Sequence, residues 1–157
     1  MTHKQTLTQQ YSHNGTRLER TAWRDEQISA RHRAWGFDCP AVDLDFLAVE
    51  YNVGKPVALI EYKYHKAATV DLQHATYRAL ADLANAYPLP FLIVRYWREP
   101  WAFRVQIGNE AALHWFNDGE TLSEFNYVKR LYLMRRAKVT AELHAKLDKT
   151  LPEDLTK

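Results

Sequence analysis

Hydrophobic positions change their spacing several times along the chain, and each change marks the boundary of a predicted element. Residues 41–51 alternate between apolar and polar positions, and residues 56–64 are almost wholly apolar until Glu61, so two strands are predicted. Between them lies Asn52-Val53-Gly54-Lys55, which predicts a hairpin turn with glycine available for a left-handed position. A strand as apolar as the second one is typical of a sheet covered on both faces.

Helical spacing of apolar residues occurs in three other stretches: residues 16–35, 70–87 and 121 to about 144, the last of which is compatible with one helix or two. Gly36 and Pro88 end the first two of these, as expected for helix termini. Further apolar runs predict a third strand, a fourth strand, and either a short edge strand or a helical turn: residues 90–97, 101–107 and 112–116. The predicted order is therefore α-β-β-α-β-β-α, an α/β (α+β) fold with a central mixed sheet flanked by helices.

Composition restricts the class of protein further. The 157 residues are 46% hydrophobic and 25% charged, which predicts one globular domain over residues 1–157, with residues 1–15 and 151–157 expected to be flexible. No apolar run reaches membrane-spanning length, and the polar start does not read as a secretory signal. The single cysteine, Cys39, excludes an internal disulfide and a cysteine zinc cluster, so we expect a cytoplasmic protein. A net charge of +2 does not by itself indicate nucleic-acid binding.

Acidic side chains and one lysine gather at the predicted hairpin. Asp43 and Asp45 share one face of the first strand, and Glu61 and Lys63 share one face of the second. Folding about the turn brings the two sets close together. Two or three carboxylates beside an ammonium are suited to a divalent cation next to a reacting phosphate.

This arrangement resembles the PD-(D/E)XK nuclease superfamily in its helix-strand-strand-helix-strand order and in Pro40, Asp43 or Asp45, Glu61 and Lys63. The resemblance implies a restriction-endonuclease-like core and hydrolysis of phosphodiester bonds with Mg²⁺ or Mn²⁺, with DNA favoured as the nucleic-acid partner. Further along the chain, Gln73-His74-Ala75-Thr76-Tyr77 is similar to the Gln-x-x-x-Tyr motif of RecB-like nucleases. In that comparison Gln73 and Tyr77 share a helix face, border the catalytic centre and contact the nucleic-acid strand.

The residues divide into metal ligands and a cation. Asp45 and Glu61 would supply carboxylates and Tyr62 a backbone carbonyl, while Lys63 would orient water or stabilise developing negative charge. Asp45 is favoured over Asp43 because it lies deeper in the strand and opposite Glu61 in a simple register. Asp43 is then a second ligand or a cap of the preceding connector.

Several other residues have two readings each. On the first helix, Glu19 and Glu26 could reach the metal through water, with Glu26 preferred, or could be solvated. His65 and His74 suggest a base or a metal pair, although surface positions are commoner for such histidines. The aromatic residues flanking the turn after the third strand could stack on bases or pack in the core: Tyr96, Trp97 and Trp101.

Three function classes remain open. The leading one is a metal-dependent nuclease. The second is a weakly active or inactive nuclease-fold module that binds nucleic acid, and the third is a protein-interaction module. A homo-oligomer or a protein complex is compatible with each class. The pattern does not choose between DNA and RNA, between single and double strands, or between exo- and endonuclease action.

Overall fold

The computed structural model describes residues 31, 34–35 and 44–155. Internal contacts divide the chain into two units, Met1–Ala41 and Val42–Lys157. In the first unit Arg31 and Ala34 are helical and Trp35 lies in a turn. The remainder of the helix predicted over residues 16–35 lies outside the described residues, and so do five residues considered above: Glu19, Glu26, Cys39, Pro40 and Asp43. All that follows concerns the second unit.

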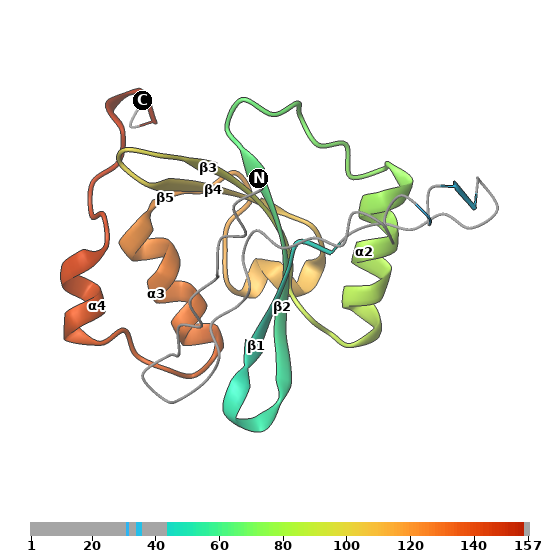
Figure 1. Cartoon of the computed structure of the whole chain (residues 1–157), viewed down its shortest axis with the longest axis horizontal. Coiled ribbons are helices and arrows are strands. Elements are labelled where there is room, and N and C mark those ends of the chain that lie inside the picture. Colours follow the sequence, from blue (N-terminus) through green and yellow to red (C-terminus); the bar gives the residue numbers. More distant parts are fainter. Residues whose placement is uncertain (1–30, 32–33, 36–43, 156–157) are drawn as a thin grey trace, which may run out of the picture. The chain divides into compact units, whose positions relative to one another are not determined.

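A five-stranded mixed sheet forms the centre of this unit, with the strands in chain order β1-β2-β3-β4-β5 (Figure 1). The strands are β1 (Phe46–Glu50), β2 (Lys55–Tyr64), β3 (Phe91–Trp97), β4 (Ala102–Ile107) and β5 (Thr121–Ser123). β2 and β3 are parallel, and every other neighbouring pair is antiparallel. Parallel neighbours need a long crossover connection, which here contains the helix α2 (Ala75–Ala86).

Side chains that accept backbone hydrogen bonds define where the helices begin. His74, Ser123 and Thr140 are the N-cap residues of α2, α3 (Glu124–Met134) and α4 (Ala141–Lys146), respectively. Three 3₁₀ helices complete the described elements: η1 (Tyr51–Val53), η2 (Glu110–His114) and η3 (Glu153–Leu155). None of the helices described in residues 44–155 is both long and apolar enough to cross a membrane.

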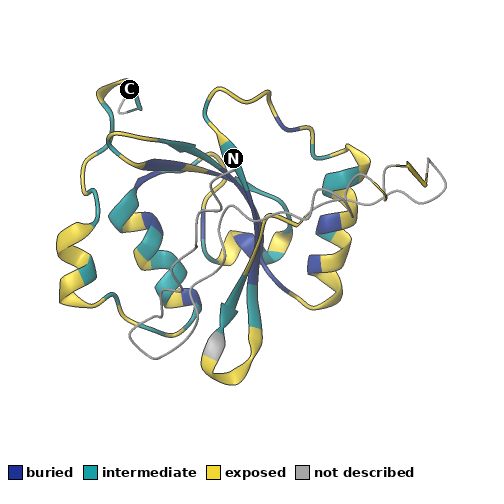
Figure 2. Ribbon diagram, in the orientation of Figure 1, coloured by how far each residue is buried: buried dark blue, intermediate teal, exposed yellow. Residues whose placement is uncertain are grey.

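Each face of the sheet has its own hydrophobic core, because successive side chains of a strand point to opposite faces. On one face α2 contributes Leu80 and Ala84 to a core with Leu59, Phe91 and Ile93. On the other face α3 contributes to a larger core made of alternate strand residues and of residues from η2 and β5: Ala58, Ile60, Leu92, Val94, Phe103, Val105, Ala112, Phe116, Leu122, Tyr127 and Met134. The central strands are accordingly the most deeply buried part of the sheet (Figure 2).

The mixed α+β architecture and the central strands agree with the sequence-based prediction, whereas several boundaries do not. Among the described residues the first strand begins at Phe46, so Leu44 and Asp45, which were predicted within it, lie just before it. The turn contains η1, and Gly54 has the expected positive φ of 61°. The helix predicted over residues 70–87 begins only at Ala75. The Asp71 carboxylate accepts the Gln73 N–H in the turn before α2, and the His74 ring, as N-cap, accepts the Thr76 N–H in the first turn of α2.

The helical stretch predicted from residue 121 was wrong in its first turn, and of its two alternatives, one helix or two, the structure has two. Residues 121–123 form β5 against β4, where Leu122 and Ser123 are buried, and the Ser123 hydroxyl caps α3 instead of continuing it. α3 then ends before Arg136, which has a φ of 55°, and α4 is a separate helix. The stretch 112–116 falls largely in η2, so the helical-turn alternative was the correct one.

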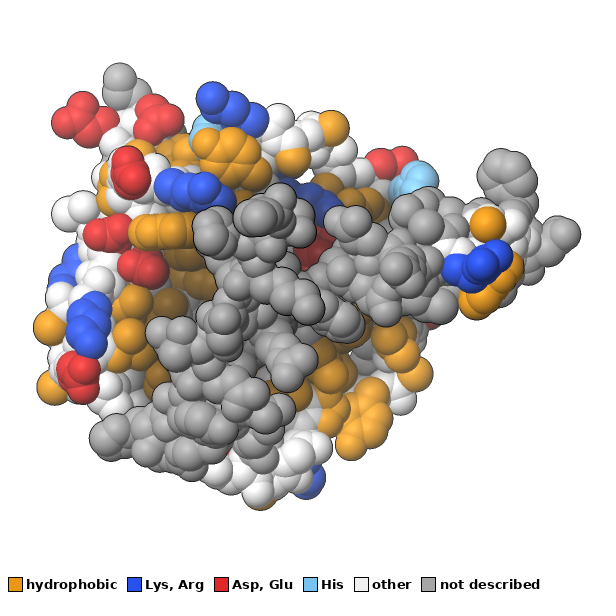
Figure 3. All heavy atoms as spheres, viewed as in Figure 1, with side chains coloured by type: hydrophobic (Ala, Val, Ile, Leu, Met, Phe, Trp, Pro, Cys, Tyr) orange, Lys and Arg blue, Asp and Glu red, His pale blue; other side chains and the backbone are white. Residues whose placement is uncertain are grey.

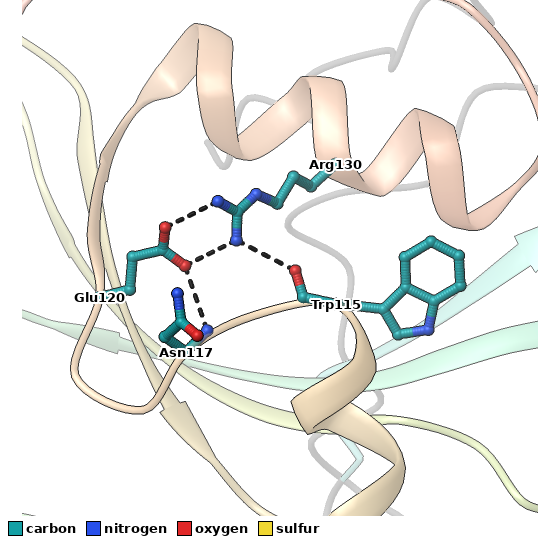
Figure 4. Close-up of polar contacts among 4 residues, drawn as sticks. All are labelled: Trp115, Asn117, Glu120 and Arg130. Atoms are coloured by element: carbon teal, nitrogen blue, oxygen red, sulfur yellow. Dashed lines mark hydrogen bonds and ion pairs between the residues drawn. The ribbon is translucent and has the colours of Figure 1, made fainter.

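Arg130 of α3 holds the loop between η2 and β5 by hydrogen bonds and an ion pair. Its guanidinium donates to both carboxylate oxygens of Glu120 at 2.6 and 2.7 Å and to the Trp115 carbonyl at 3.0 Å (Figure 4). Glu120 also accepts the Asn117 backbone N–H at 3.2 Å. A fork-to-fork pair of this kind holds both partners in one geometry, so the loop, the edge strand and α3 are tied together.

Replacing Arg130 with Lys should lower the stability of the fold, since a lysine keeps the charge but cannot make the forked contact. We expect a loss of about 2 kcal/mol and a fall in Tm of roughly 4–8 °C for a domain of this size. Thermal and urea unfolding measure both quantities. Lys146→Gln is the matched control, because the exposed Lys146–Glu142 pair should contribute less than about 0.5 kcal/mol. Equal effects of the two changes would contradict the role given to Arg130.

Candidate active site

Glu61 and Lys63 lie at the carboxyl end of β2, on the face that α2 covers. Leu59, Glu61 and Lys63 point to this face as successive odd-numbered residues of one strand, and Leu59 belongs to its core. Glu61 is only 7% exposed. The Lys63 ammonium donates to Glu61 Oε1 at 2.5 Å, which pairs one oxygen of the buried carboxylate with a cation.

The second oxygen of the same carboxylate is the unusual feature. Glu61 Oε2 is buried and has no hydrogen-bond partner within the described part of the chain. Leaving a buried charged acceptor unsatisfied costs about 1–3 kcal/mol or more, and such exceptions in folded proteins call for a specific explanation. A cation bound at this oxygen would remove that cost.

Asp45 lies beside Glu61, across the β1–β2 pair. The register pairs Phe46 with Ile60, so one further step places Asp45 opposite Glu61. Asp45 Oδ2 accepts the Tyr62 backbone N–H at 3.2 Å. This contact fixes the carboxylate at the open end of the sheet, where β1 has not yet begun and Asp45 is exposed.

The Tyr62 carbonyl points to the same side of β2 as its N–H. Leu59 and His65 donate their N–H groups to β3 or to the residue just before it, at Pro90 O and Tyr96 O. Backbone groups of successive residues point to opposite edges of a strand, so those of Tyr62, an even-numbered residue, face Asp45. The Tyr62 ring lies on the opposite face of the sheet, where its hydroxyl contacts the Tyr127 hydroxyl at 2.8 Å. Burial raises the pKa of both phenols, so this pair stays neutral and anchors the strand.

Charges around Lys63 keep it protonated. Burial lowers the pKa of the ammonium, but the hydrogen bond and charge of Glu61, with smaller contributions from Tyr77 and Asp45, outweigh burial and raise it above the usual lysine value. Since the pKa is raised, the charged form is present throughout the neutral and mildly alkaline range. Lys63 in this state can act as an electrostatic partner and not as a proton acceptor.

Asp45, Glu61 and Tyr62 offer two carboxylates and a backbone carbonyl, the oxygen types that a hard cation prefers. No group of three or more His, Cys, Asp or Glu side chains suited to a metal occurs among the described residues. Two carboxylates and a carbonyl are nevertheless a sufficient protein contribution for Mg²⁺, which usually keeps several water ligands. The unpartnered Glu61 Oε2 is the observation that favours such an ion. The predicted contributions of Asp43 and Glu26 lie outside the described residues.

The Gln73 and Tyr77 pair is placed differently from the expectation. Gln73 lies in the turn before α2 and is exposed, so the two residues do not share a helix face. Tyr77, in the first turn of α2, packs against the core under this face and is near enough to raise the pKa of Lys63. The predicted contact of either side chain with nucleic acid stays a prediction.

The histidines and the aromatic residues have packing roles that the sequence left open. His74 caps α2, and the His65 ring stacks on Trp97 with centroids 5.6 Å apart. Tyr96 stacks on Trp101 with centroids 6.0 Å apart. Each of these aromatic rings thus has an intramolecular neighbour. His65 Nδ1, however, is buried without a partner in the described part of the chain, so this ring is not fully explained by packing.

Two cations near the site were not singled out from the sequence. Arg95 of β3 pairs with Lys63 in the register, and Arg104 of β4 pairs with Arg95. Each stands alone within an apolar strand segment, and such an isolated charge inside PFLIVRYW or WAFRVQI was the signal available. The strand register that makes the two arginines neighbours could not be read from the sequence.

Comparisons with known proteins add no identification. No family model, curated protein or solved structure matches the chain.

Lys63→Ala should destabilise the fold more than Glu61→Gln. Removal of the ammonium leaves a buried carboxylate with neither oxygen compensated, which we expect to cost about 1–3 kcal/mol. Glu61→Gln removes the buried charge itself and should cost less. Urea unfolding at neutral pH without divalent cations measures both. A smaller loss for Lys63→Ala than for Glu61→Gln would mean that the ion pair does not support the carboxylate.

Proposed function

We propose that this chain is a metal-dependent nuclease that hydrolyses phosphodiester bonds, with DNA as the favoured substrate. The observation that carries the proposal is the buried Glu61 carboxylate, which has one oxygen paired with Lys63 and the other without a partner among the described residues. A cluster that combines an unsatisfied carboxylate oxygen with a protonated lysine is suited to a cation and a phosphate together.

The arrangement of the sheet supports the same reading. In sheets with parallel strands and helical crossovers, ligands bind outside the carboxyl ends of the strands. Glu61 and Lys63 lie at the carboxyl end of β2, whose parallel partner β3 follows the α2 crossover. An antiparallel β1 that brings in Asp45 and a parallel β3 beyond α2 are compatible with the restriction-endonuclease-like core, which remains part of the proposal.

Each residue has a separate task in this proposal. Asp45, Glu61 and the Tyr62 carbonyl would hold Mg²⁺ or Mn²⁺. When bound, such an ion lowers the pKa of water and offsets phosphate charge. Lys63, held as an ammonium, would stabilise negative charge that develops on the phosphate oxygens during attack. The hydrogen bond from Tyr62 N–H to Asp45 orients that carboxylate before substrate binds.

A nuclease-fold module that binds nucleic acid without cleaving it is the second candidate. The small number of possible metal ligands favours this candidate, since the described residues supply two carboxylates rather than three at this site. Acidic and basic side chains are interspersed on the surface seen in Figure 3, in line with the net charge of +2. Nucleic acid would therefore be recognised by a local group of cations in either case.

Incubation with labelled single- and double-stranded DNA and RNA tests the proposal. We expect cleavage with Mg²⁺ or Mn²⁺ and none with a chelator. Asp45→Asn and Glu61→Gln nearly preserve size and should each reduce the rate by about 10²-fold or more, as expected for the loss of a preorganised electrostatic contact. Binding measured in Ca²⁺ should change less, because most of the affinity comes from dispersed phosphate contacts.

Lys55→Gln is the control, because Lys55 lies at the opposite end of β2 and is exposed. Its cleavage rate should equal that of the parent. If Asp45→Asn and Glu61→Gln also cleave like the parent, the activity lies elsewhere. If the parent cleaves none of the four substrates but binds one of them, the binding module replaces the nuclease.

A further inference from the structure

A second feature of the same sheet face lies next to the candidate active site. A cavity of about 290 Å³ opens beside Lys63, and its lining includes Thr69, Arg95, Arg104 and Asp118. Known small-molecule pockets begin at roughly 300 Å³. The cavity is therefore suited to a group such as one phosphodiester and not to a large ligand.

Three cations form a row across adjacent strands at this cavity. Lys63 of β2 pairs with Arg95 of β3, and Arg95 pairs with Arg104 of β4. Like charges directly opposite each other in neighbouring strands destabilise a sheet. The row therefore lowers the stability of the sheet unless something else compensates its charge.

The arginine charges are not offset by carboxylates in the described part of the chain. Arg95 donates to the carbonyl of Tyr64, the last residue of β2, and to three carbonyls of the loop that follows, at His65, Ala67 and Ala68. Arg104 donates to the Thr121 hydroxyl at 2.9 Å and lies over the Trp97 ring at 5.4 Å. All of these partners are neutral, and no ion pair of either arginine occurs within the described residues.

Asp118 is the acidic residue in the lining, and it is exposed. Its Oδ1 accepts the Ile107 N–H at 2.9 Å, a bond that holds the side chain at the end of β4. With Lys63 paired to Glu61, two arginines face one solvated carboxylate. The cavity thus keeps a positive charge that an anion could balance.

We propose that this cavity binds a phosphate of the nucleic-acid backbone adjacent to the phosphate at Glu61 and Lys63. The inference rests on the proposed function in its choice of ligand. The row of Lys63, Arg95 and Arg104 spans two interstrand steps, about 10 Å, a length over which one nucleic-acid strand presents more than one phosphate. Arg104 is the contact residue. Arg95, which is held by four carbonyls, positions the loop and adds charge.

The test is the binding of a fluorescein-labelled oligonucleotide in Ca²⁺, measured by anisotropy over a range of salt concentrations. Arg104→Gln should weaken binding about tenfold at low salt and reduce the salt slope by about 0.7–0.9, the value for one phosphate contact. Arg104→Lys should retain the slope. Lys55→Gln, which removes an exposed charge at the far end of β2, should retain both slope and affinity. The Tm of each variant reports whether it is folded.

Asp118→Asn should change the affinity for the oligonucleotide in the opposite direction to Arg104→Gln. Asparagine keeps a carbonyl oxygen for the Ile107 N–H but removes the negative charge at the cavity. Binding should become tighter, by about three- to tenfold at low salt. Unchanged affinity in both Asp118→Asn and Arg104→Gln would overturn the proposal.

Oligonucleotides with a single neutral methylphosphonate linkage identify the phosphate concerned. When the neutral linkage replaces the phosphate that Arg104 contacts, the loss of affinity caused by the linkage and the loss caused by Arg104→Gln should not add, because both remove the same contact. Additive losses at every position would overturn the proposal. If the parent cleaves with Mg²⁺ and Arg104→Gln alters neither affinity nor KM, the cavity proposal fails while the nuclease stands. If nothing is cleaved but the Arg104 coupling is found, the nuclease fails and the cavity stands.

Discussion

Burial of the Glu61 carboxylate at the end of a central strand is the constraint on which the rest of the site depends. A carboxylate that is 7% exposed must be compensated, and Lys63 compensates one of its oxygens. The neighbouring carboxylate of Asp45 is oriented by the Tyr62 backbone. These contacts leave Glu61 Oε2 without a partner among the described residues, and the contact with Glu61 keeps Lys63 charged.

The sheet keeps this charged group in place through packing on both faces. The residues between the charged ones point away from the site, and the Tyr62 hydroxyl contacts Tyr127 of α3 on the far side. Core residues from α2 lie under Leu59 and Ile93 on the near side. β2 therefore cannot shift its register by one residue without exchanging a buried carboxylate for a tyrosine ring. Stability of the cores and geometry of the site are coupled in this strand.

The same sheet also places three basic side chains beside one another. Pairing of β2, β3 and β4 aligns Lys63, Arg95 and Arg104, although they lie far apart in sequence. The two arginines use neutral partners, so their charge remains available to an anion. A carboxylate pair and a basic cavity on one sheet face together suit a ligand with a repeated negative charge, which is why the site and the cavity are interpreted as parts of one nucleic-acid surface.

Local pattern by itself determined the elements with strong apolar spacing and the position of the acidic residues within them. The β2 strand, the hairpin at Gly54 and the proximity of Asp45, Glu61 and Lys63 followed from alternation and a tight turn. Tertiary structure alone decided the features that depend on distant partners. Thr121–Ser123 reads as helix but pairs with β4. Gln73 lies outside α2, because Asp71 accepts its N–H in the preceding turn and His74 is the N-cap of the helix. The basic cavity could not be predicted from the sequence for the same reason. The sequence shows single arginines in two strands, and only the pairing of those strands shows that they are neighbours.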